Sequence, residues 1–189
     1  GRPMRWLPLL AVVALYLAVA ALVILLWAFA PLVAAVAFIL MTAYHWGKAD
    51  AVFELCHRGV SRLSEERFRF WALAAVRGYI PMALPFLAFP GQTQSFLDAC
   101  LRVFSSPGIP NWDPVGRALL ALGLVLALVH LLQYLPAACR TSGAADRRIL
   151  LESLVMAAFF LAVPPLVAIG WYFCGWHSFR HVLRLSIYE

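Results

Sequence analysis

Residues 7–29 read LPLLAVVALYLAVAALVILLWAF, a charge-free run of about 23 residues, enough to cross the ~30 Å hydrocarbon layer of a bilayer as an α-helix. The rest of the chain has the same character. Of its 189 residues, 64% are hydrophobic and 13% are charged, whereas soluble domains are nearer half apolar and a quarter charged. A domain of this length in water still needs a polar surface, so the composition indicates that lipid surrounds it. The sequence therefore predicts an all-α, multi-pass transmembrane helical bundle.

Further apolar segments follow the first. Pro31 begins a second helix, at a position where its missing N–H does no harm. The charged stretch 48–69 is expected as an interfacial helix, which either continues that span or stands apart, followed by a loop. Two more spans are expected at 70–89 and 114–136. Between them, the Gly- and Pro-rich segment 90–113 indicates a loop with a short amphipathic helix, and a basic connector follows at 139–148.

The last apolar region, residues 149–185, is too long for one crossing, since it would measure about 55 Å as a straight helix. Pro164 and Pro165 must interrupt its hydrogen-bond ladder, which leaves either a kinked helix or two helices that turn back. A reversal puts the C-terminal arginines on the same side as the other basic segments, as the positive-inside rule favours. We therefore predict about six membrane segments in a single domain, residues 1–189, with the last region broken at these prolines.

The net charge of +6 does not indicate a nucleic-acid partner. Basic residues cluster in the short segments between apolar runs, which is the distribution that orients membrane proteins, and they form no binding stripe. We expect a multi-pass protein of the cytoplasmic membrane, in contact with lipid. The four cysteines are scattered without a CxxC pair, so they are expected to be small buried residues or free thiols and not a zinc or disulfide framework.

Two histidines lie in the aromatic segment WYFCGWHSFRH, residues 171–181. His177 and His181 are four residues apart, so a helix presents both on one face. This spacing also arises from ordinary helix packing, but an apolar segment makes polar groups without partners costly. His45 offers a third imidazole, and the nearby Asp50 is able to hold the N–H of a ligand imidazole. Three imidazoles without cysteine suit a borderline metal such as iron(II), zinc or copper.

The remaining polar residues in apolar surroundings have several interpretations. His57 lies in the charged stretch and is interpreted as interfacial. His130 lies in the middle of a span, where it either hydrogen-bonds across helices or contacts a metal or substrate. Arg180, between the paired histidines, is expected to reach the interface or to pair with a carboxylate. Gly47 is expected to let another backbone approach closely.

Three segments together resemble one known family: PPLVAIGWYFCGWHSFRH (164–181), AYHWGKAD (43–50) and RGYIPMALPFLAFP (77–90). They resemble the Brp/Blh family of membrane β-carotene 15,15′-dioxygenases, and the likeness covers most of the chain. The resemblance implies a multi-helical membrane enzyme that cleaves the central double bond of β-carotene with O₂ and yields two retinals. It also implies a catalyst of non-haem iron(II) held by histidines.

The resemblance assigns roles to individual residues. His45 matches the histidine of the family's His-aromatic-Gly-x-x-Asp motif, and Asp50 matches its acidic residue, which implies a place behind the metal ligands. His177 and His181 match the C-terminal histidine pair. The implied metal ligands and catalytic residues are therefore His45, His177 and His181. Aromatic residues near them are expected to line a tunnel for the polyene: Trp46, Trp171, Tyr172, Phe173, Trp176 and Phe179.

One family motif has no counterpart in this chain. The family's earlier His-Gly-x-x-Asp motif would fall upstream of Gly1, so the family's N-terminal helical part is expected to precede this residue. The alternative is that this member lacks that ligand. In that case His130 is the candidate within this chain for the missing metal ligand.

Three other functions are compared with carotene cleavage. A carotenoid- or retinal-binding membrane protein without cleavage activity remains an alternative. A di-iron desaturase of the histidine-box kind is disfavoured, because five scattered histidines cannot form its clusters. A rhodopsin is disfavoured as well, since it needs a lysine in a late helix and the single lysine, Lys48, lies at the end of an early span.

Overall fold

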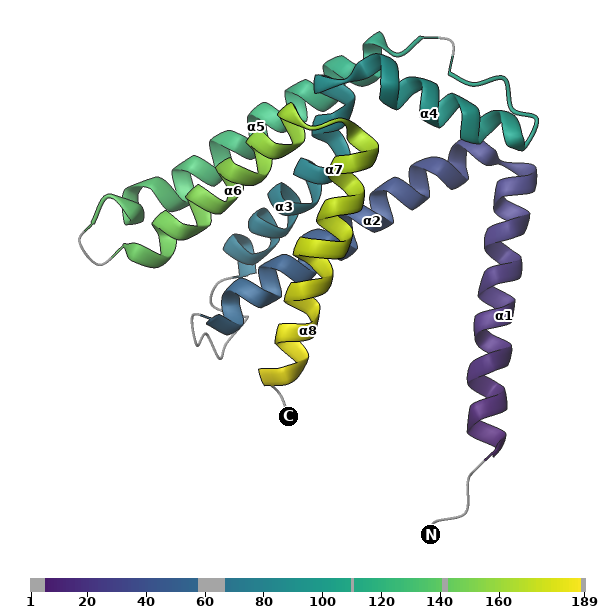
Figure 1. Ribbon diagram of the computed structural model, residues 1–189, viewed down its shortest axis with the longest axis horizontal. Helices are drawn as coiled ribbons and strands as arrows, with labels where there is room; N and C mark the ends of the chain where they lie inside the picture. Colours follow the sequence, from purple (N-terminus) through teal and green to yellow (C-terminus); the bar gives the residue numbers. More distant parts are fainter. Residues whose placement is uncertain (1–5, 58–66, 110, 141–142, 188–189) are drawn as a thin grey trace.

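The computed structural model describes residues 6–57, 67–109, 111–140 and 143–187, and over these residues the chain is helical without any strand (Figure 1). The all-α prediction is therefore confirmed for this part. In chain order the helices are α1 (Trp6–Phe29), α2 (Pro31–His57), α3 (Arg67–Ala88), α4 (Pro90–Val103), α5 (Asp113–Ala138), α6 (Ala144–Ala162), α7 (Pro165–Trp171), the π-helical turn η1 (Tyr172–His177) and α8 (Ser178–Ile187).

Four helices of the described part are long and apolar enough to cross a membrane. These segments are Pro8–Phe29, Pro31–Glu54, Arg67–Ala88 and Asp113–Ala138, and they match the four early spans that the sequence predicts. The charged stretch after Lys48 continues α2 without a break as far as His57. Figure 1 shows α1 standing apart from the other helices. Most of its apolar side chains are exposed, as a helix surrounded by lipid requires.

The chain turns back at the two prolines, as the sequence predicts. Helix α6 ends at Ala162, and Val163 and Pro164 are both extended, with ψ angles of 134° and 142°. Helix α7 then begins at Pro165, where a missing N–H breaks no bond. Figure 1 shows α6 running up to this point and α7 running down from it. The total of six crossing segments stays a prediction.

The basic connector is shorter than predicted, because α6 already begins at Ala144. Arg147 donates hydrogen bonds to the carbonyls of Ala138 and Arg140 at 2.9 and 3.0 Å, near the end of α5. Asp146, in the first turn of α6, accepts from Arg69 of α3 at 2.8 Å. The bonds of Arg147 satisfy carbonyl groups near the end of α5, and together with that of Asp146 they favour an early start of α6. From the charges alone, the first residues of α6 were expected to belong to the connector.

Helices α2 and α3 pack closely because small residues face each other. A Cβ added at Gly47 would collide with the carbonyl of Ala74, and one added at Gly78 would collide with the carbonyl of Ala43. The two glycines and two alanines therefore form the small-residue contact that membrane helices use to bring backbones together. The predicted approach of a second backbone at Gly47 is confirmed.

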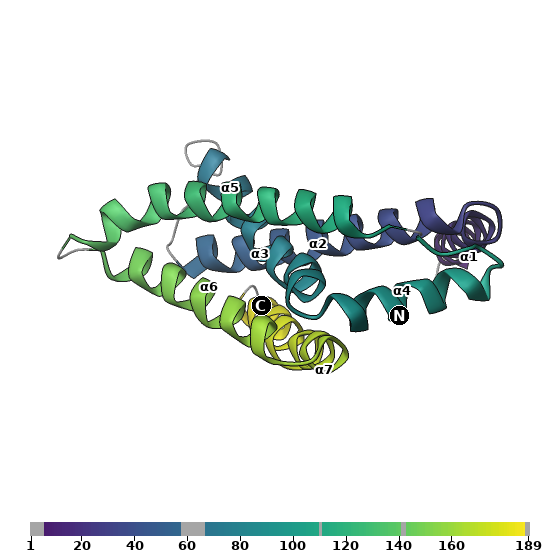
Figure 2. The ribbon, with the colours of Figure 1, turned by 90° about the horizontal axis from the view of Figure 1, so that it is seen from above.

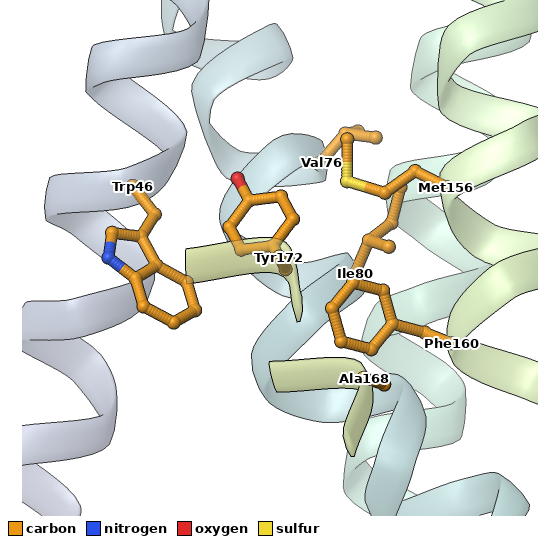
Figure 3. Packing of buried hydrophobic residues seen from close by; sticks show 7 residues of the cluster. All are labelled: Trp46, Val76, Ile80, Met156, Phe160, Ala168 and Tyr172. Carbon is orange, nitrogen blue, oxygen red and sulfur yellow. The ribbon is translucent and has the colours of Figure 1, made fainter. Parts of the chain in front are cut away.

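The C-terminal helices pack on α2 and α3 through a buried apolar cluster. Figure 3 shows the rings of Trp46 and Tyr172 side by side, with Phe160 and the aliphatic side chains beyond them. Phe160 is fully buried and Tyr172 is 2% exposed. The cluster consists of Trp46, Val76, Ile80, Met156, Phe160, Ala168 and Tyr172.

The cysteines are free thiols where the structure describes them. Cys139 and Cys174 are exposed and Cys100 is partly exposed, so of the two alternatives the free thiol, and not the buried residue, is confirmed at these positions. A thiol is apolar enough to face lipid, and an exposed position therefore carries little cost. The side chain of Cys56 lies outside the described residues.

Candidate active site

Two of the predicted metal ligands meet in the structure. His45, on α2, and His177, at the end of η1, have ring centroids 5.5 Å apart with planes at 60°. The fold brings these distant parts of the chain together because the prolines reverse the C-terminal segment and lay it along α2. Metal–nitrogen bonds measure about 2 Å, so one ion is able to contact both rings.

His177 is presented by an unusual turn of helix. Residues Tyr172–His177 form a π-helix, whose wider turn rotates the residues after it relative to α7. The Ser178 hydroxyl donates to the carbonyl of Phe173, five residues back, at 2.7 Å. π-Helical turns are rare and are frequently found at functional sites. The turn fixes the direction in which His177 and the following helix α8 face.

Three of the six aromatic residues predicted to line a tunnel surround His177. The centroid of its ring lies 5.8 Å from that of Trp46, 6.4 Å from Tyr172 and 6.2 Å from Phe173. Trp46 and Tyr172 are buried, while Phe173 is half exposed. The imidazole is therefore bounded on several sides by apolar rings, which is a suitable wall for a hydrocarbon substrate.

The other three aromatic residues predicted to line the tunnel do not surround His177. Trp171 is exposed on the outside of α7 and packs against Phe159 at 5.8 Å. Phe179 is exposed as well. Trp176 lies beneath Arg180 and donates from its indole N–H to Asp50 Oδ1 at 3.3 Å.

His181 shares a small cavity with His177. The cavity measures about 10 Å³, close to the minimum for one water molecule, and is also lined by Ala49, Asp50 and Arg180. In the described part of the chain, no three His, Cys, Asp or Glu side chains are grouped to hold a metal ion. The ligand set of His45, His177 and His181 therefore stays a prediction, of which the structure brings His45 and His177 into ring contact.

The remaining histidines lie elsewhere. His130 is buried on α5 and its ring packs on Tyr134 at 4.9 Å. It lines a cavity between α3, α5 and α6, and the lining contains none of the predicted metal ligands. Helix α2 ends at His57, whose side chain lies outside the described residues.

Asp50 lies at the centre of a hydrogen-bonded group. Its Oδ1 accepts from Arg180 at 2.9 Å, and its Oδ2 pairs with Arg77 at 3.3 Å. Because Trp176 and Arg180 flank His177 in the chain, Asp50 fixes the segment that carries both C-terminal histidines. A direct role of Asp50 toward a ligand imidazole stays a prediction.

Asp50 belongs to a larger set of paired charges, of which Arg148 is 44% exposed and the others are buried or partly buried. Arg180 also contacts Glu54 at 3.2 Å and Glu152 at 2.7 Å. Arg77 contacts Glu152 at 3.2 Å, and Arg148 contacts Glu54 at 2.7 Å. Three arginines thus balance three carboxylates. We call this set the ion-pair cluster; its members are Asp50, Glu54, Arg77, Arg148, Glu152 and Arg180.

Arg180 is the member that joins the cluster to the histidines. Its side chain is only 12% exposed, and its guanidinium lies over the rings of Trp176 and Phe53, at 4.1 and 4.6 Å. Such stacking adds a cation–π attraction to the ion pairs. Of the two expectations for Arg180, pairing with a carboxylate is confirmed.

The structure adds three residues to those singled out in the sequence: Arg77 and Glu54, which are buried, and Glu152, which is partly buried. Arg77 carried a usable signal, since a charge inside an apolar span marks a paired or functional group. Its pairing with Asp50 and Glu152 had no signal in the sequence, because these carboxylates lie on separate helices and their approach depends on packing.

Fold and site together define a helical membrane protein in which histidines, aromatic rings and a neutral ion-pair cluster are gathered between α2 and the C-terminal helices. The family follows from comparison with known proteins. Residues 1–188 match the family model described as Beta-carotene 15,15'-dioxygenase, and the chain belongs to this family. The resemblance inferred from the three sequence motifs is thereby confirmed.

Two relatives from Halobacterium salinarum illustrate the relationship. The chain is 37% identical over 188 residues to the probable beta-carotene 15,15'-dioxygenase Blh of strain NRC-1, covering 95% of this chain and 52% of that protein. It is 35% identical over 121 residues to the probable beta-carotene 15,15'-dioxygenase Brp of strain R1, covering 61% and 33%. The chain thus spans about half the length of Blh. No solved structure matches the chain.

Proposed function

We propose that this chain forms part of a multi-pass enzyme of the cytoplasmic membrane that uses O₂ to cleave the central double bond of β-carotene into two retinals. The observation that carries the proposal is the meeting of His45 and His177, ring to ring at 5.5 Å, in a member of this family. Placing two imidazoles from distant helices side by side in an apolar protein costs free energy unless a bound group between them interacts with both.

The donor set fits iron(II). Neutral imidazoles are suitable ligands for iron, and they leave its positive charge available to an oxygen-derived anion. We propose His45, His177 and His181 as the ligands, with a further one from the family's N-terminal motif, because His130 lines a separate cavity that contains none of the three. When bound, iron(II) supplies the activation of O₂ that cleavage of an alkene requires. The ion-pair cluster beside the ligands is formally neutral, so it adds no net charge that would compete with the metal.

The aromatic rings give the site its affinity for a hydrocarbon. Trp46, Tyr172 and Phe173 surround His177, and they offer flat apolar surfaces against which a polyene can lie. These rings also exclude water from the reacting bond. The membrane location fits the substrate, since a carotene dissolves in lipid and reaches the site from the bilayer.

A reconstitution experiment tests the proposal. Membranes that contain the full-length protein are supplied with β-carotene and iron(II), and retinal is quantified by chromatography. His177→Ala should reduce retinal to background, because it removes one ligand. His57→Ala, which replaces a histidine of the charged stretch, is the matched control and should keep its activity. Far-UV circular dichroism establishes that both variants retain their helices.

Each outcome has a defined meaning. Undiminished retinal from His177→Ala would remove His177 from the ligand set. A wild-type protein that holds the carotene with its polyene absorption intact, and forms no retinal, would favour the carotenoid-binding alternative. Metal analysis of the purified protein adds an independent readout, since one iron per chain is expected and two would indicate a different class of oxygenase.

A further inference from the structure

A second cavity lies away from the predicted metal ligands. It measures about 450 Å³ and is bounded by α3, α5 and α6. In Figure 2, α5 and α6 diverge from their connecting segment, and α3 lies between them in this view. The volume falls in the range of small-molecule sites. The lining is almost entirely aliphatic, and includes Val76, Ile80, Leu84, Leu126, Ala127 and Leu154.

One polar side chain in this lining has no partner. His130 is 6% exposed, and neither of its ring nitrogens has a hydrogen-bond partner. The other polar groups of the lining are satisfied, since Tyr79 donates to the carbonyl of Leu119 at 2.7 Å and Ser153 donates to that of Ile149 at 2.8 Å. A buried group without a partner is rare and costly. The cavity is therefore suited to an apolar molecule that brings one hydrogen-bonding atom to His130.

The cavity lies one layer of side chains from the rings around His177. Val76 and Ile80 line it and also belong to the apolar cluster with Trp46 and Tyr172. Figure 3 shows Tyr172 between Trp46 and these aliphatic side chains. The cavity therefore adjoins the apolar cluster whose rings, Trp46 and Tyr172, pack against His177.

We propose that this cavity binds retinal, with the polyene along the aliphatic lining and the aldehyde oxygen accepting a hydrogen bond from His130. This inference rests on the proposed function for its choice of ligand. The substrate is a hydrocarbon and offers nothing to an imidazole, whereas each product molecule carries one oxygen atom that accepts a hydrogen bond. His130 thus distinguishes product from substrate, and the cavity holds the product in an apolar place outside the site of cleavage.

Binding to the purified, iron-free full-length protein tests the imidazole. Two probes are titrated, retinal and the corresponding hydrocarbon in which a methyl group replaces the aldehyde, and quenching of tryptophan fluorescence reports binding. His130→Leu should weaken retinal binding five- to tenfold, the effect of one hydrogen bond, and leave the hydrocarbon unaffected. His130→Gln keeps an N–H donor and should restore most of the affinity for retinal.

A second pair of variants tests the cavity itself. Ala127→Trp places a large ring in the lining and should weaken binding of both probes at least tenfold. Ala121→Trp, on the same helix but outside the lining, is the matched control and should bind both probes like the wild type. Equal retinal binding by the two tryptophan variants would overturn the proposal. So would a loss of both probes in His130→Leu, because the imidazole would then act only on the fold.

These measurements stand apart from the cleavage assay. They need neither iron nor O₂, so a protein that binds retinal through His130 and forms none would retain the cavity assignment and lose the proposed function. An active enzyme whose retinal affinity is indifferent to Ala127→Trp would retain the function and lose the cavity assignment. A phospholipid that copurifies in the cavity and resists displacement by retinal would also overturn the inference.

Discussion

Replacing Arg180 by methionine should destabilise the protein through charge imbalance. The side chain makes three ion-pair contacts, at 2.9 Å to Asp50, 3.2 Å to Glu54 and 2.7 Å to Glu152. Its loss leaves three carboxylates against two arginines in the ion-pair cluster. Removing one partner from a buried ion pair costs about 3–5 kcal/mol, mainly because the remaining charge stays buried without compensation. We expect the free energy of unfolding to fall by about this amount.

A second substitution separates charge from packing. Asp50→Asn removes one carboxylate, so in combination with Arg180→Met it restores two arginines against two carboxylates. The double variant should therefore be more stable than Arg180→Met alone. The free energy of unfolding that the double variant loses relative to wild type should be smaller than the sum of the losses of the two single variants. We expect the difference to be about 0.5–3 kcal/mol, the range found for residues in contact.

Unfolding in mixed micelles, followed by far-UV circular dichroism, measures these differences. Arg102→Met is the matched control, because Arg102 is exposed on α4 and lies outside the cluster. It should change the free energy of unfolding by about 0.5 kcal/mol or less. Additive losses in the double variant would refute the reasoning, since they would show that the cluster does not act as one balanced set of charges.

Two further substitutions test the packing that positions the site, each measured by the same unfolding assay. Gly47→Ala should cost about 1–3 kcal/mol because its Cβ collides with the carbonyl of Ala74, whereas Gly170→Ala, which points into open space, should change little. Phe160→Ala should cost about 2–3 kcal/mol, at the low end of core values because lipid weakens the hydrophobic term, whereas the exposed Leu161→Ala should cost far less.

The parts of the fold that were predictable depend on local chemistry. A charge-free run long enough to span the bilayer specifies α1 whatever surrounds it, and proline begins or interrupts a helix through its own ring and missing N–H. The starts of α2 and α7 at Pro31 and Pro165, and the reversal between α6 and α7, follow from these residues alone. The start of α6 was misplaced because the charges of its first turn resemble those of a loop until their partners on α3 and α5 are known.

The parts of the site that were not predictable depend on packing between helices. The spacing of His177 and His181 lies within one segment and could be read directly, whereas the approach of His45 to His177 depends on how α7 and α8 lie along α2. The π-helical turn that orients His177 has no signal in its composition, because its residues also suit an ordinary helix. The expected pairing of Arg180 with a carboxylate and the charge of Arg77 inside an apolar span were the visible signs of the ion-pair cluster.

The ion-pair cluster is what holds α8 in place. This helix has 10 residues, too few to be stable by itself, and its side chains Phe179 and Val182 are exposed and add little buried apolar contact. Arg180 anchors it, because its contacts reach α2 and α6 at once. The positions of the two C-terminal histidines therefore have different origins. His177 packs against the buried rings of Trp46 and Tyr172, whereas His181 directly follows Arg180 in the chain, so a change in the cluster should shift His181 more than His177.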